Sequence, residues 1–532
     1  MLHSESWKNS TQGHIALTLF FGLLVLGTLN ACFWHRVSPE EEALYNKRQQ
    51  LLSDSLPAAQ QWLQAFAASH RDSVQTDKKV NQYYKDNGHW FWLSEDTAFM
   101  AKADEITDFL EKQAHEMGFS AQAFHIDDIR TNIRMLRQMD FDSTHVSAVE
   151  TMALLEWQLS RAFLRYAQGQ RYGFTNPHRM LNRLDARKEG GFRIIYDIDI
   201  EKADDNFLTT ALGHAGDKHP ADYLKKAETD HPVYAQLKRE LANDSTGTNR
   251  QRILCNMERL RWRHVQQINP NEKHIFVNIA AQQLWAICPD SVLSMRICCG
   301  AWKTKTPLLE SNISYIQFNP EWNIPASILR DEVSAHAGDS AYFARNDYFI
   351  VNRNTGDTIS PKLITSSQLK SGAYRVAQRS GKHNSLGRII FRFKNQFDVY
   401  LHDTNNHNAF NADRRTISHG CVRVQRPFNL LLFVLNDPDE WMLDKIRLSI
   451  DMKPETERGI KYLKEHNEEH SEEPIRLTQL AYVKPNIPLS IDYYTYYPNP
   501  ETGEFETWPD RYEYDNQIIK AIKPFLPINV HQ

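Results

Sequence analysis

Basic residues are not in excess in this sequence of 532 residues. Lys and Arg number 62 against 66 Asp and Glu, which leaves a formal net charge of −4. Like charges occur only in short solvated stretches, such as residues 464–469. A protein dedicated to nucleic acids would carry a basic excess or a basic stripe. Nucleic acid is therefore not an expected partner.

Cysteine is also scarce, with six positions that are irregularly spaced. A disulfide-stabilised secreted domain would show a denser and more regular set. Four of the six are interpreted as small core residues: Cys255, Cys288, Cys298 and Cys299. Cys421 has different neighbours and needs a separate explanation.

Long apolar runs are absent after the N-terminus, where Ile15–Ala31 carries no charge and follows Lys8. This pattern predicts a signal sequence or a single membrane anchor within residues 1–37. The preceding Leu29-Asn30-Ala31 also makes Cys32 a candidate for lipidation. Either reading places the chain after about Arg36 outside the cytoplasm, attached to the membrane by its N-terminal segment only.

Apolar residues make up 41% of the chain and charged residues 24%, as in ordinary globular proteins. Its length predicts more than one domain. Residues 38–250 have a mainly helical pattern that ends in a polar boundary, Asp217–Gly247, and residues 251–516 have a mainly β pattern. Residues 517–532 form a C-terminal tail. The expected fold class is α+β, with a helical scaffold domain and a mainly β catalytic domain.

A segment of about 322–371 interrupts the strands of the β domain. It contains a predicted helix, Ala326–His336, between a Pro325 entry and a break at Gly338. We expect it to be a lid over an active site, and an ordinary insertion is the alternative. Trp322 is a candidate for the lid wall and for substrate contact, with a core aromatic as the alternative.

The segment VYLHDTNNHNAFNADRRTISHGCVRVQRP, residues 399–427, carries the candidate chemistry. A free thiol has a pKa of about 8.5 and attacks carbonyls only as a thiolate. A nearby imidazole can take its proton, and His402 is the candidate base for Cys421. A cysteine after glycine on a tight turn can also present backbone N–H groups to an oxyanion. The predicted site is therefore a cysteine nucleophile with its base 19 positions earlier.

These residues resemble the signature of the YkuD-type L,D-transpeptidases. His402, the polar loop and Ser418-His419-Gly420-Cys421 carry the resemblance, over roughly residues 250–515. The flanking matches are Asn256–Trp262, Lys305–Pro307, Asn319–Pro325 and Tyr400–Asp403. They are similar to the subfamily with a helical scaffold and a capping segment. That subfamily usually has a peptidoglycan-binding module before the catalytic domain, but His231 to Asn256 leaves no room for one.

The resemblance implies a periplasmic enzyme that cross-links peptidoglycan stem peptides without metal or cofactor. Cys421 would attack the donor tetrapeptide, and the amine of a second stem peptide would accept the acyl group as a 3-3 cross-link. His402 would act as base and acid, while Ser418, His419 and Gly420 shape the site. Carbapenem β-lactams would acylate the same thiol. Arg423 would pair with a substrate carboxylate or make a structural ion pair, and Tyr400 is a further candidate for substrate contact.

Other readings of the same residues remain open. An L,D-carboxypeptidase would use the same thiolate and release the acyl group to water. A non-catalytic wall-binding scaffold would need no Cys–His pair. A zinc site among His402, Asp403, His407, His419 and Cys421 fits no common ligand spacing. A papain-like protease is disfavoured, because such an enzyme has its cysteine before its histidine in the chain.

Overall fold

The computed structural model describes residues 39–72, 74–86, 88–93, 98–141, 147–187, 190–469 and 473–527. The predicted anchor, with Cys32, lies outside these residues. None of the described helices is long and apolar enough to cross a membrane. The chain divides into two compact units. The first comprises Met1–Asp108, His125–Phe163 and Leu212–Pro220; the second comprises Phe109–Phe124, Leu164–Ala211 and Ala221–Gln532.

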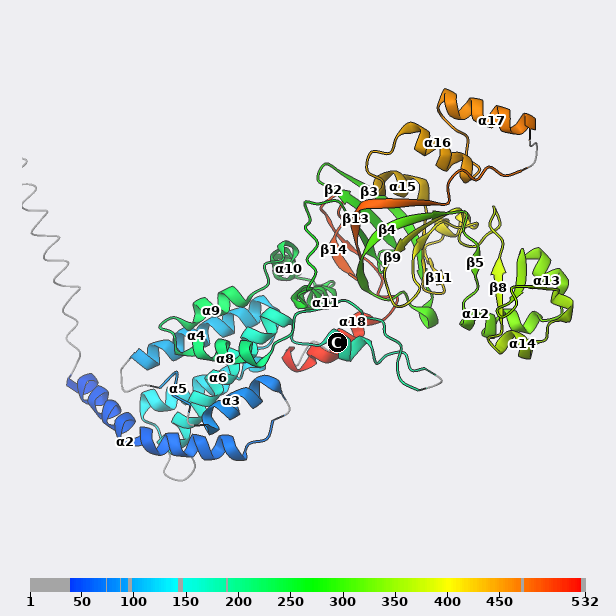
Figure 1. Ribbon diagram of the computed structural model, residues 1–532. Coiled ribbons are helices and arrows are strands. Elements are labelled where there is room, and N and C mark those ends of the chain that lie inside the picture. Colours follow the sequence, from blue (N-terminus) through cyan, green and yellow to red (C-terminus); the bar gives the residue numbers. More distant parts are fainter. Residues whose placement is uncertain are drawn as a thin grey trace, which may run out of the picture. The chain divides into compact units, whose positions relative to one another are not determined.

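The first unit is helical and is drawn mainly in blue and cyan in Figure 1. Its helices are α2 (Pro39–Ser69), α3 (Gln75–Lys85), α5 (Ile126–Gln138) and the first parts of α4 (Ala98–Glu116) and α6 (Ala148–Tyr172). Buried Glu156 of α6 accepts hydrogen bonds from the backbone N–H groups of Phe91, Trp92 and Leu93. Burial raises the pKa of this carboxyl to about 7. Glu156 therefore fixes residues 91–93 against α6.

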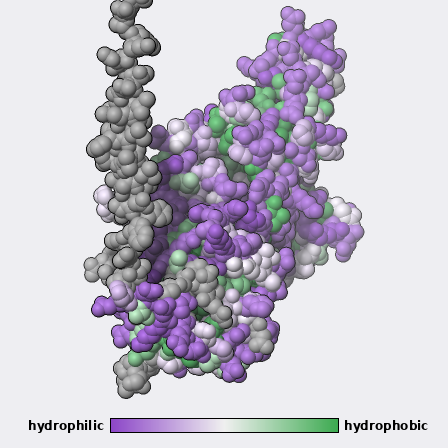
Figure 2. Space-filling model, turned by 90° about the vertical axis from the view of Figure 1, so that its left-hand side faces the viewer, coloured by the Kyte–Doolittle hydropathy of each residue, from purple (hydrophilic) through white to green (hydrophobic). Residues whose placement is uncertain are grey.

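Further helices belong to the second unit, except that the end of α8 and the first residue of α9 fall in the first unit. They are α7 (Pro177–Leu181), α8 (Asp205–Gly213), α9 (Pro220–Ala227), α10 (Pro232–Asn243), α11 (Arg250–Arg261) and α18 (Tyr514–Ile522). The polar stretch 217–247 thus contains helices, and its Leu224 and Leu237 are buried. On the face shown in Figure 2, hydrophobic residues are scattered among hydrophilic ones.

The β domain is a closed barrel. Its strand order is β3-β12-β10-β9-β4-β13-β1-β2, and the pairing of β2 with β3 closes the ring. The short β11 (Thr416–Ser418) adds to β3 in parallel. The ring strands are β1 (His274–Asn278), β2 (Gln283–Cys288), β3 (Ser291–Gly300), β4 (Leu309–Phe318), β9 (Ile389–Phe393), β10 (Leu401–His402), β12 (Val422–Val424) and β13 (Leu480–Asp492). Closure pairs backbone groups that an open sheet would leave at its edges.

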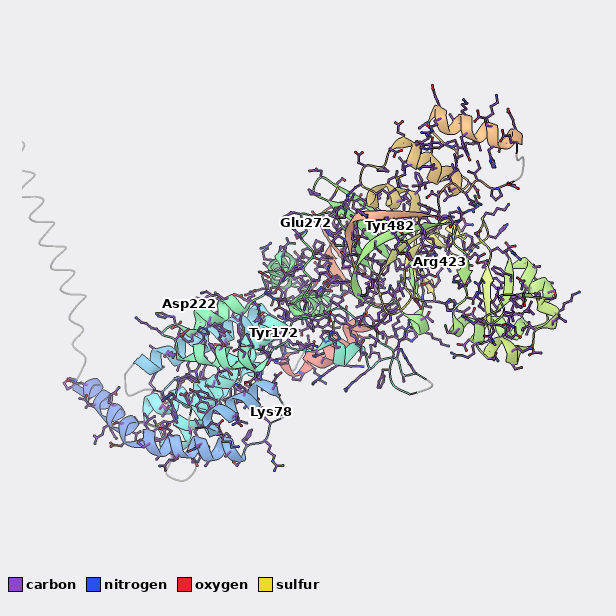
Figure 3. All side chains as sticks on the ribbon, viewed as in Figure 1. Lys78, Tyr172, Asp222, Glu272, Arg423 and Tyr482 are labelled. Carbon is purple, nitrogen blue, oxygen red and sulfur yellow. The ribbon has the colours of Figure 1, made fainter. Side chains whose placement is uncertain are left out.

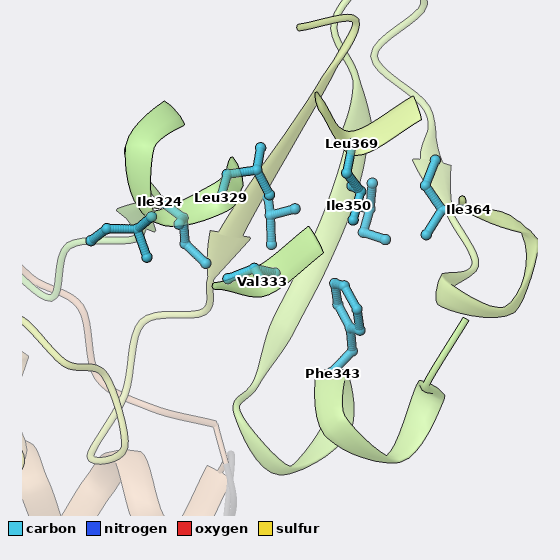
Figure 4. Packing of buried hydrophobic residues seen from close by; sticks show 9 residues of the cluster. Ile324, Leu329, Val333, Phe343, Ile350, Ile364 and Leu369 are labelled. Carbon is cyan, nitrogen blue, oxygen red and sulfur yellow. The ribbon is translucent and has the colours of Figure 1, made fainter. Parts of the chain in front are cut away.

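The segment predicted as a lid folds around its own small sheet, which we call the cap. Its strand order is β5-β8-β6-β7, from β5 (Trp322–Asn323), β6 (Tyr348–Asn352), β7 (Thr358–Ile359) and β8 (Tyr374–Gln378). Helices α12 (Ala326–Asp331), α13 (Ser340–Arg345) and α14 (Ser366–Lys370) cover it. Its core contains the residues labelled in Figure 4: Ile324, Leu329, Val333, Phe343, Ile350, Ile364 and Leu369. The cap therefore has a hydrophobic core of its own.

The helix predicted over Ala326–His336 is shorter than expected. α12 ends at Asp331, and a 3-10 turn, Val333–His336, follows. Glu332 lies at the junction with φ −123° and ψ −62°, outside regular helical geometry. Glu332 therefore does not lie on a continuous helical face, and its side chain is about half exposed.

The chain after β12 forms α15 (Pro427–Val434), α16 (Glu440–Ser449) and α17 (Glu457–Glu469), followed by the hairpin β14 (Tyr496–Pro498) and β15 (Phe505–Thr507). Buried Asp444 accepts hydrogen bonds from the backbone of Glu455 and Thr456. Those bonds position the start of α17. The predicted α+β class, with a helical N-terminal region and a mainly β C-terminal domain, is confirmed.

Candidate active site

Cys421 lies on a tight turn between β11 and β12. Ser418 closes this turn: its buried Oγ donates to the Cys421 carbonyl at 2.6 Å and accepts from the Gly420 N–H at 3.1 Å. Gly420 has φ +125°, a conformation that side chains with a Cβ rarely adopt. Ser418 and Gly420 therefore shape the turn that presents Cys421.

The turn is held from behind by the loop that follows β3. Thr306 Oγ1 donates to the Gly420 carbonyl at 2.8 Å, and Thr304 Oγ1 donates to the Ser418 carbonyl at 2.8 Å. Gly300 permits this approach, because a Cβ there would lie 2.1 Å from the Thr304 carbonyl oxygen. We call residues 300–306 the supporting loop.

The Cys421 thiol lies against Tyr400, and the Asp398 carbonyl lies 3.7 Å from Sγ. Burial raises the pKa of this thiol to about 11, although Tyr400, Arg392 and Arg423 each act to lower it. Desolvation penalises the thiolate more than these groups stabilise it. The resting nucleophile is therefore a neutral thiol.

The Asp398 carbonyl is positioned by a loop, residues 395–399, that Asn395 organises through its side chain. Asn395 Oδ1 accepts from the N–H groups of Phe397 and Val399, and its Nδ2 donates to the Val399 carbonyl at 2.7 Å. Asp398 adopts φ +53°, which takes it out of extended geometry. Regular strand pairing of β10 therefore covers only Leu401–His402.

His402 lies on β10, which pairs in parallel with β12 so that His402 is opposite Arg423. Strand spacing and rise then put the Cα atoms of His402 and Cys421 roughly 8 Å apart. His402 is 3% exposed, and its Nδ1 has no hydrogen-bond partner among the described residues. Burial, and then the charge of Arg423, lower the pKa of this imidazole to about 3. The lowered pKa favours a neutral His402 ring, and the described structure leaves its Nδ1 without a partner.

The two pKa shifts differ from the thiolate–imidazolium pair that the sequence suggested for Cys421 and His402. Both shifts favour the uncharged form of their group. Desolvation is the largest cause of both shifts: at Cys421 it outweighs the nearby arginines, and at His402 the charge of Arg423 acts in the same direction as burial.

Two arginines flank this pair. Arg423, labelled in Figure 3, has a buried Nε without a partner in the described structure. Arg392 on β9 lies over the Tyr400 ring at 4.5 Å and donates to Gln317 at 2.9 Å. Sequence reasoning missed Arg392, because its place beside Tyr400 depends on the pairing of β9 with β10. Cys421 and His402 therefore lie close to two positively charged side chains.

The other predicted residues lie at the edges of this site. His419 points to the cap, and its Nε2 lies 2.8 Å from Glu332 Oε1. Trp322 packs against the core of the cap, so its position supports the core alternative more than direct substrate contact. Tyr400 does contact the nucleophile, and its ring lies 5.7 Å from the His402 ring. Burial raises the pKa of Tyr400, which keeps its hydroxyl protonated.

A segment from before the β domain also reaches the supporting loop. Residues 182–187 and 190–201, which we call the strap, add to the barrel through a bridge between Tyr196 and Leu308. Asp185 Oδ1 binds Nζ of Lys305 at 2.7 Å, and this lysine is only 2% exposed. Arg193 donates to the carbonyl oxygens of Lys303 at 3.3 Å and Lys305 at 2.8 Å. The strap thus fixes the loop that supports the nucleophile turn.

The strap contacts the second loop of the site as well. Gln396 Nε2 donates to Asp197 Oδ1 at 2.8 Å, and Gln396 precedes the Asp398 carbonyl. No motif in the sequence marks this role, because the strap is about 230 residues from Cys421. In the structure, the strap is organised by its charged residues and by Asn182, whose Oδ1 accepts hydrogen bonds from the backbone N–H groups of Ile195 and Tyr196.

Replacing Arg193 by alanine is expected to slow acylation of Cys421 by about tenfold, because a small displacement of a reacting group is costly. Arg193→Lys should recover part of this loss, since a lysine can still donate to one carbonyl. The measurement is the rate of carbapenem adduct formation by intact mass, with circular dichroism to establish folding. Arg187→Ala, at an exposed strap position, is the matched control. Equal rates for all three variants would contradict a positioning role.

The remaining described cysteines are free thiols. Cys255, Cys298 and Cys299 are buried as expected, whereas Cys288 is partly exposed beside the turn that joins β2 and β3. Its interpretation as a core residue is therefore wrong, because β2 ends at the barrel rim. A hydrogen bond from Ser291 lowers the pKa of Cys288. Among the described residues, no group of three or more His, Cys, Asp or Glu side chains is arranged to hold a metal ion.

Comparison with known proteins agrees with the fold. Residues 272–438 match the YkuD family, the L,D-transpeptidase catalytic domain, and residues 78–241 match the Scaffold domain. The chain therefore contains a YkuD-type L,D-transpeptidase catalytic domain together with a Scaffold domain. It is 27% identical over 309 residues to a protein of Haemophilus influenzae named "Putative L,D-transpeptidase". The match spans 56% of this chain and 56% of that protein.

Proposed function

We propose that this protein forms 3-3 cross-links between peptidoglycan stem peptides through a thioester on Cys421. The family relationship supports peptidoglycan as the substrate. The site adds a thiol, a neutral base and two arginines at the place where β10, β12 and β9 meet. These groups match the needs of acyl transfer from a peptide that carries a carboxylate.

In the first half of the proposed reaction, Cys421 Sγ attacks the carbonyl that joins the third, diamino residue of a donor tetrapeptide to its terminal D-alanine. The thiol proton passes to Nδ1 of His402 as the sulfur–carbon bond forms. The oxyanion faces the nucleophile turn. Because the Gly420 N–H already donates to Ser418, the Cys421 N–H is the better candidate donor. His402 then protonates the D-alanine nitrogen, and the carbon–nitrogen bond breaks.

In the second half, the amine of an acceptor stem peptide attacks the thioester carbonyl. It gives its proton to His402, the sulfur–carbon bond breaks, and the thiol is restored. A new amide then links the two diamino residues. Arg423, with its unpartnered Nε, is the candidate for the donor carboxylate, and a charge-assisted hydrogen bond would hold it.

One observation carries this proposal: the buried, unpartnered Nδ1 of His402 lies on the strand beside the Cys421 turn. A buried nitrogen acceptor without a partner is costly for stability. Proton transfer from a thiol during catalysis would use that acceptor. A histidine with a purely structural role would be expected to have both ring nitrogens bonded.

Product analysis of purified protein with a disaccharide-tetrapeptide tests the proposal. We expect a cross-linked dimer with release of D-alanine, identified by mass spectrometry. Tripeptide alone, without dimer at any donor concentration, would instead establish an L,D-carboxypeptidase. Neither product would remove the enzymatic proposal and favour a wall-binding scaffold.

The location belongs to the same proposal. The apolar residues 15–31 would anchor the chain to the membrane, as a helix or through a lipid on Cys32. The scaffold domain, 38–250, and the catalytic domain, 251–516, would then act in the periplasm, where the polymer is. Carbapenems would acylate Cys421 in place of the donor.

A further inference from the structure

The cap places one carboxylate beside the nucleophile turn. Glu332 Oε1 lies 2.8 Å from Nε2 of His419, two residues before Cys421. Both side chains remain accessible, with Glu332 56% and His419 51% exposed. A surface pair of this kind contributes little to stability. Its position at the junction of cap and nucleophile turn needs another explanation.

Aromatic rings accompany this carboxylate. The negative charge of Glu332 is felt by the phenols of Tyr342 and Tyr348, which places both near it. Tyr342 stacks on His336 with ring centroids 3.8 Å apart. A carboxylate beside aromatic faces is a typical environment for an organic cation. The neighbouring cation, Arg330, is paired with Asp331 at 2.9 Å.

The charges around Cys421 are therefore divided between two sides. Arg392 and Arg423 lie on the barrel side and act on the thiol and on His402. Glu332 lies on the cap side. The donor reacts at a carbonyl next to its terminal D-alanine carboxylate, whereas the acceptor reacts through an amine that is an ammonium group at neutral pH. Charge complementarity assigns the two substrates to opposite sides.

We propose that Glu332 binds the cationic amine of the acceptor stem peptide and guides it toward the acylated Cys421 from the cap side. This inference rests on the proposed transpeptidase function. Glu332 releases His419 to receive the ammonium group, and Tyr342 and Tyr348 lie near the carboxylate. The ammonium group loses one proton to solvent to become the nucleophilic amine, and His402 takes the second proton as the thioester is attacked, so Glu332 is a binding residue rather than a base.

The variant Glu332→Gln tests this role, because it removes the charge and keeps the size. The matched control is Asp331→Asn, which neutralises the adjacent carboxylate of the cap. With disaccharide-tetrapeptide as donor and acceptor, E332Q should lower the ratio of dimer to tripeptide by about tenfold, as expected for a lost charged hydrogen bond. The acceptor concentration for half-maximal dimer formation should rise by a similar factor. Added salt should reduce dimer formation in the unmodified protein more than in E332Q.

Acylation by a carbapenem serves as the internal reference. E332Q should form the Cys421 adduct at the unmodified rate, because the donor half does not use Glu332. Equal dimer-to-tripeptide ratios in E332Q, D331N and the unmodified protein would overturn the inference and leave the transpeptidase intact. Acylation followed only by hydrolysis in the unmodified protein would also overturn it. Absence of any adduct on Cys421 would overturn the proposed function itself.

Discussion

Replacing Cys421 by alanine is expected to abolish both carbapenem acylation and dimer formation, a loss of at least about 10³-fold. The variant removes the only atom in the site that can form a thioester, and no described neighbour can substitute for it. Its folding should be unchanged, because the turn depends on Ser418, Gly420 and the supporting loop. Intact-mass analysis after carbapenem exposure, with peptide mapping, gives the measurement.

Cys288→Ala provides the matched control for that experiment. Cys288 is a partly exposed thiol whose pKa is lowered, whereas burial raises the pKa of Cys421 to about 11. A reagent that reacts only with ionised, accessible thiols would therefore label Cys288 first. We expect the carbapenem to label Cys421 alone. An adduct on Cys288, or a full adduct yield in Cys421→Ala, would contradict a catalytic site at Cys421.

Replacing His402 by glutamine is expected to slow acylation of Cys421 by about 10²- to 10⁴-fold. The thiol is neutral at rest, so its attack depends on a base that receives the proton. Glutamine preserves the approximate volume and polarity but cannot accept a proton at this pH. Adduct formation should be followed over time, with His407→Gln, an exposed imidazole on the following loop, as the control. Rates within threefold of the unmodified protein would exclude His402 as the base.

The same variant has a predicted effect on stability in acid. The folded pKa of His402 is lowered to about 3 from 6.5, so below pH 6.5 the unfolded chain binds a proton that the folded protein does not. The associated stability is present above pH 6.5 and is lost as the pH falls toward 3, by roughly 5 kcal/mol at most. His402→Gln should flatten this dependence in denaturant unfolding measured from pH 7 to 4. An unchanged slope would show that His402 is not buried as a neutral ring.

Much of this protein could be predicted from the order of its residues. The motif from Ser418 to Cys421, with His402 before it, indicates the family, and the helical and β patterns indicate the two classes of structure. These features are local: a tight turn needs glycine, and periodicity reflects which face is buried. The loop before β10 is different, because side-chain bonds of Asn395 replace regular strand pairing there, and a pattern of apolar residues carries no sign of them.

What only the tertiary structure decided is the surroundings of the thiol. Sequence chemistry suggested an ion pair, but burial of both Cys421 and His402 favours their neutral forms, and burial depends on the whole barrel. Arg392, Arg193 and Glu332 reach the site from another strand, from the strap and from the cap. The residue types and their local spacing follow from the chain itself. Which distant charges meet at Cys421 follows from strand pairing and packing, because electrostatic and desolvation effects depend on distance in space.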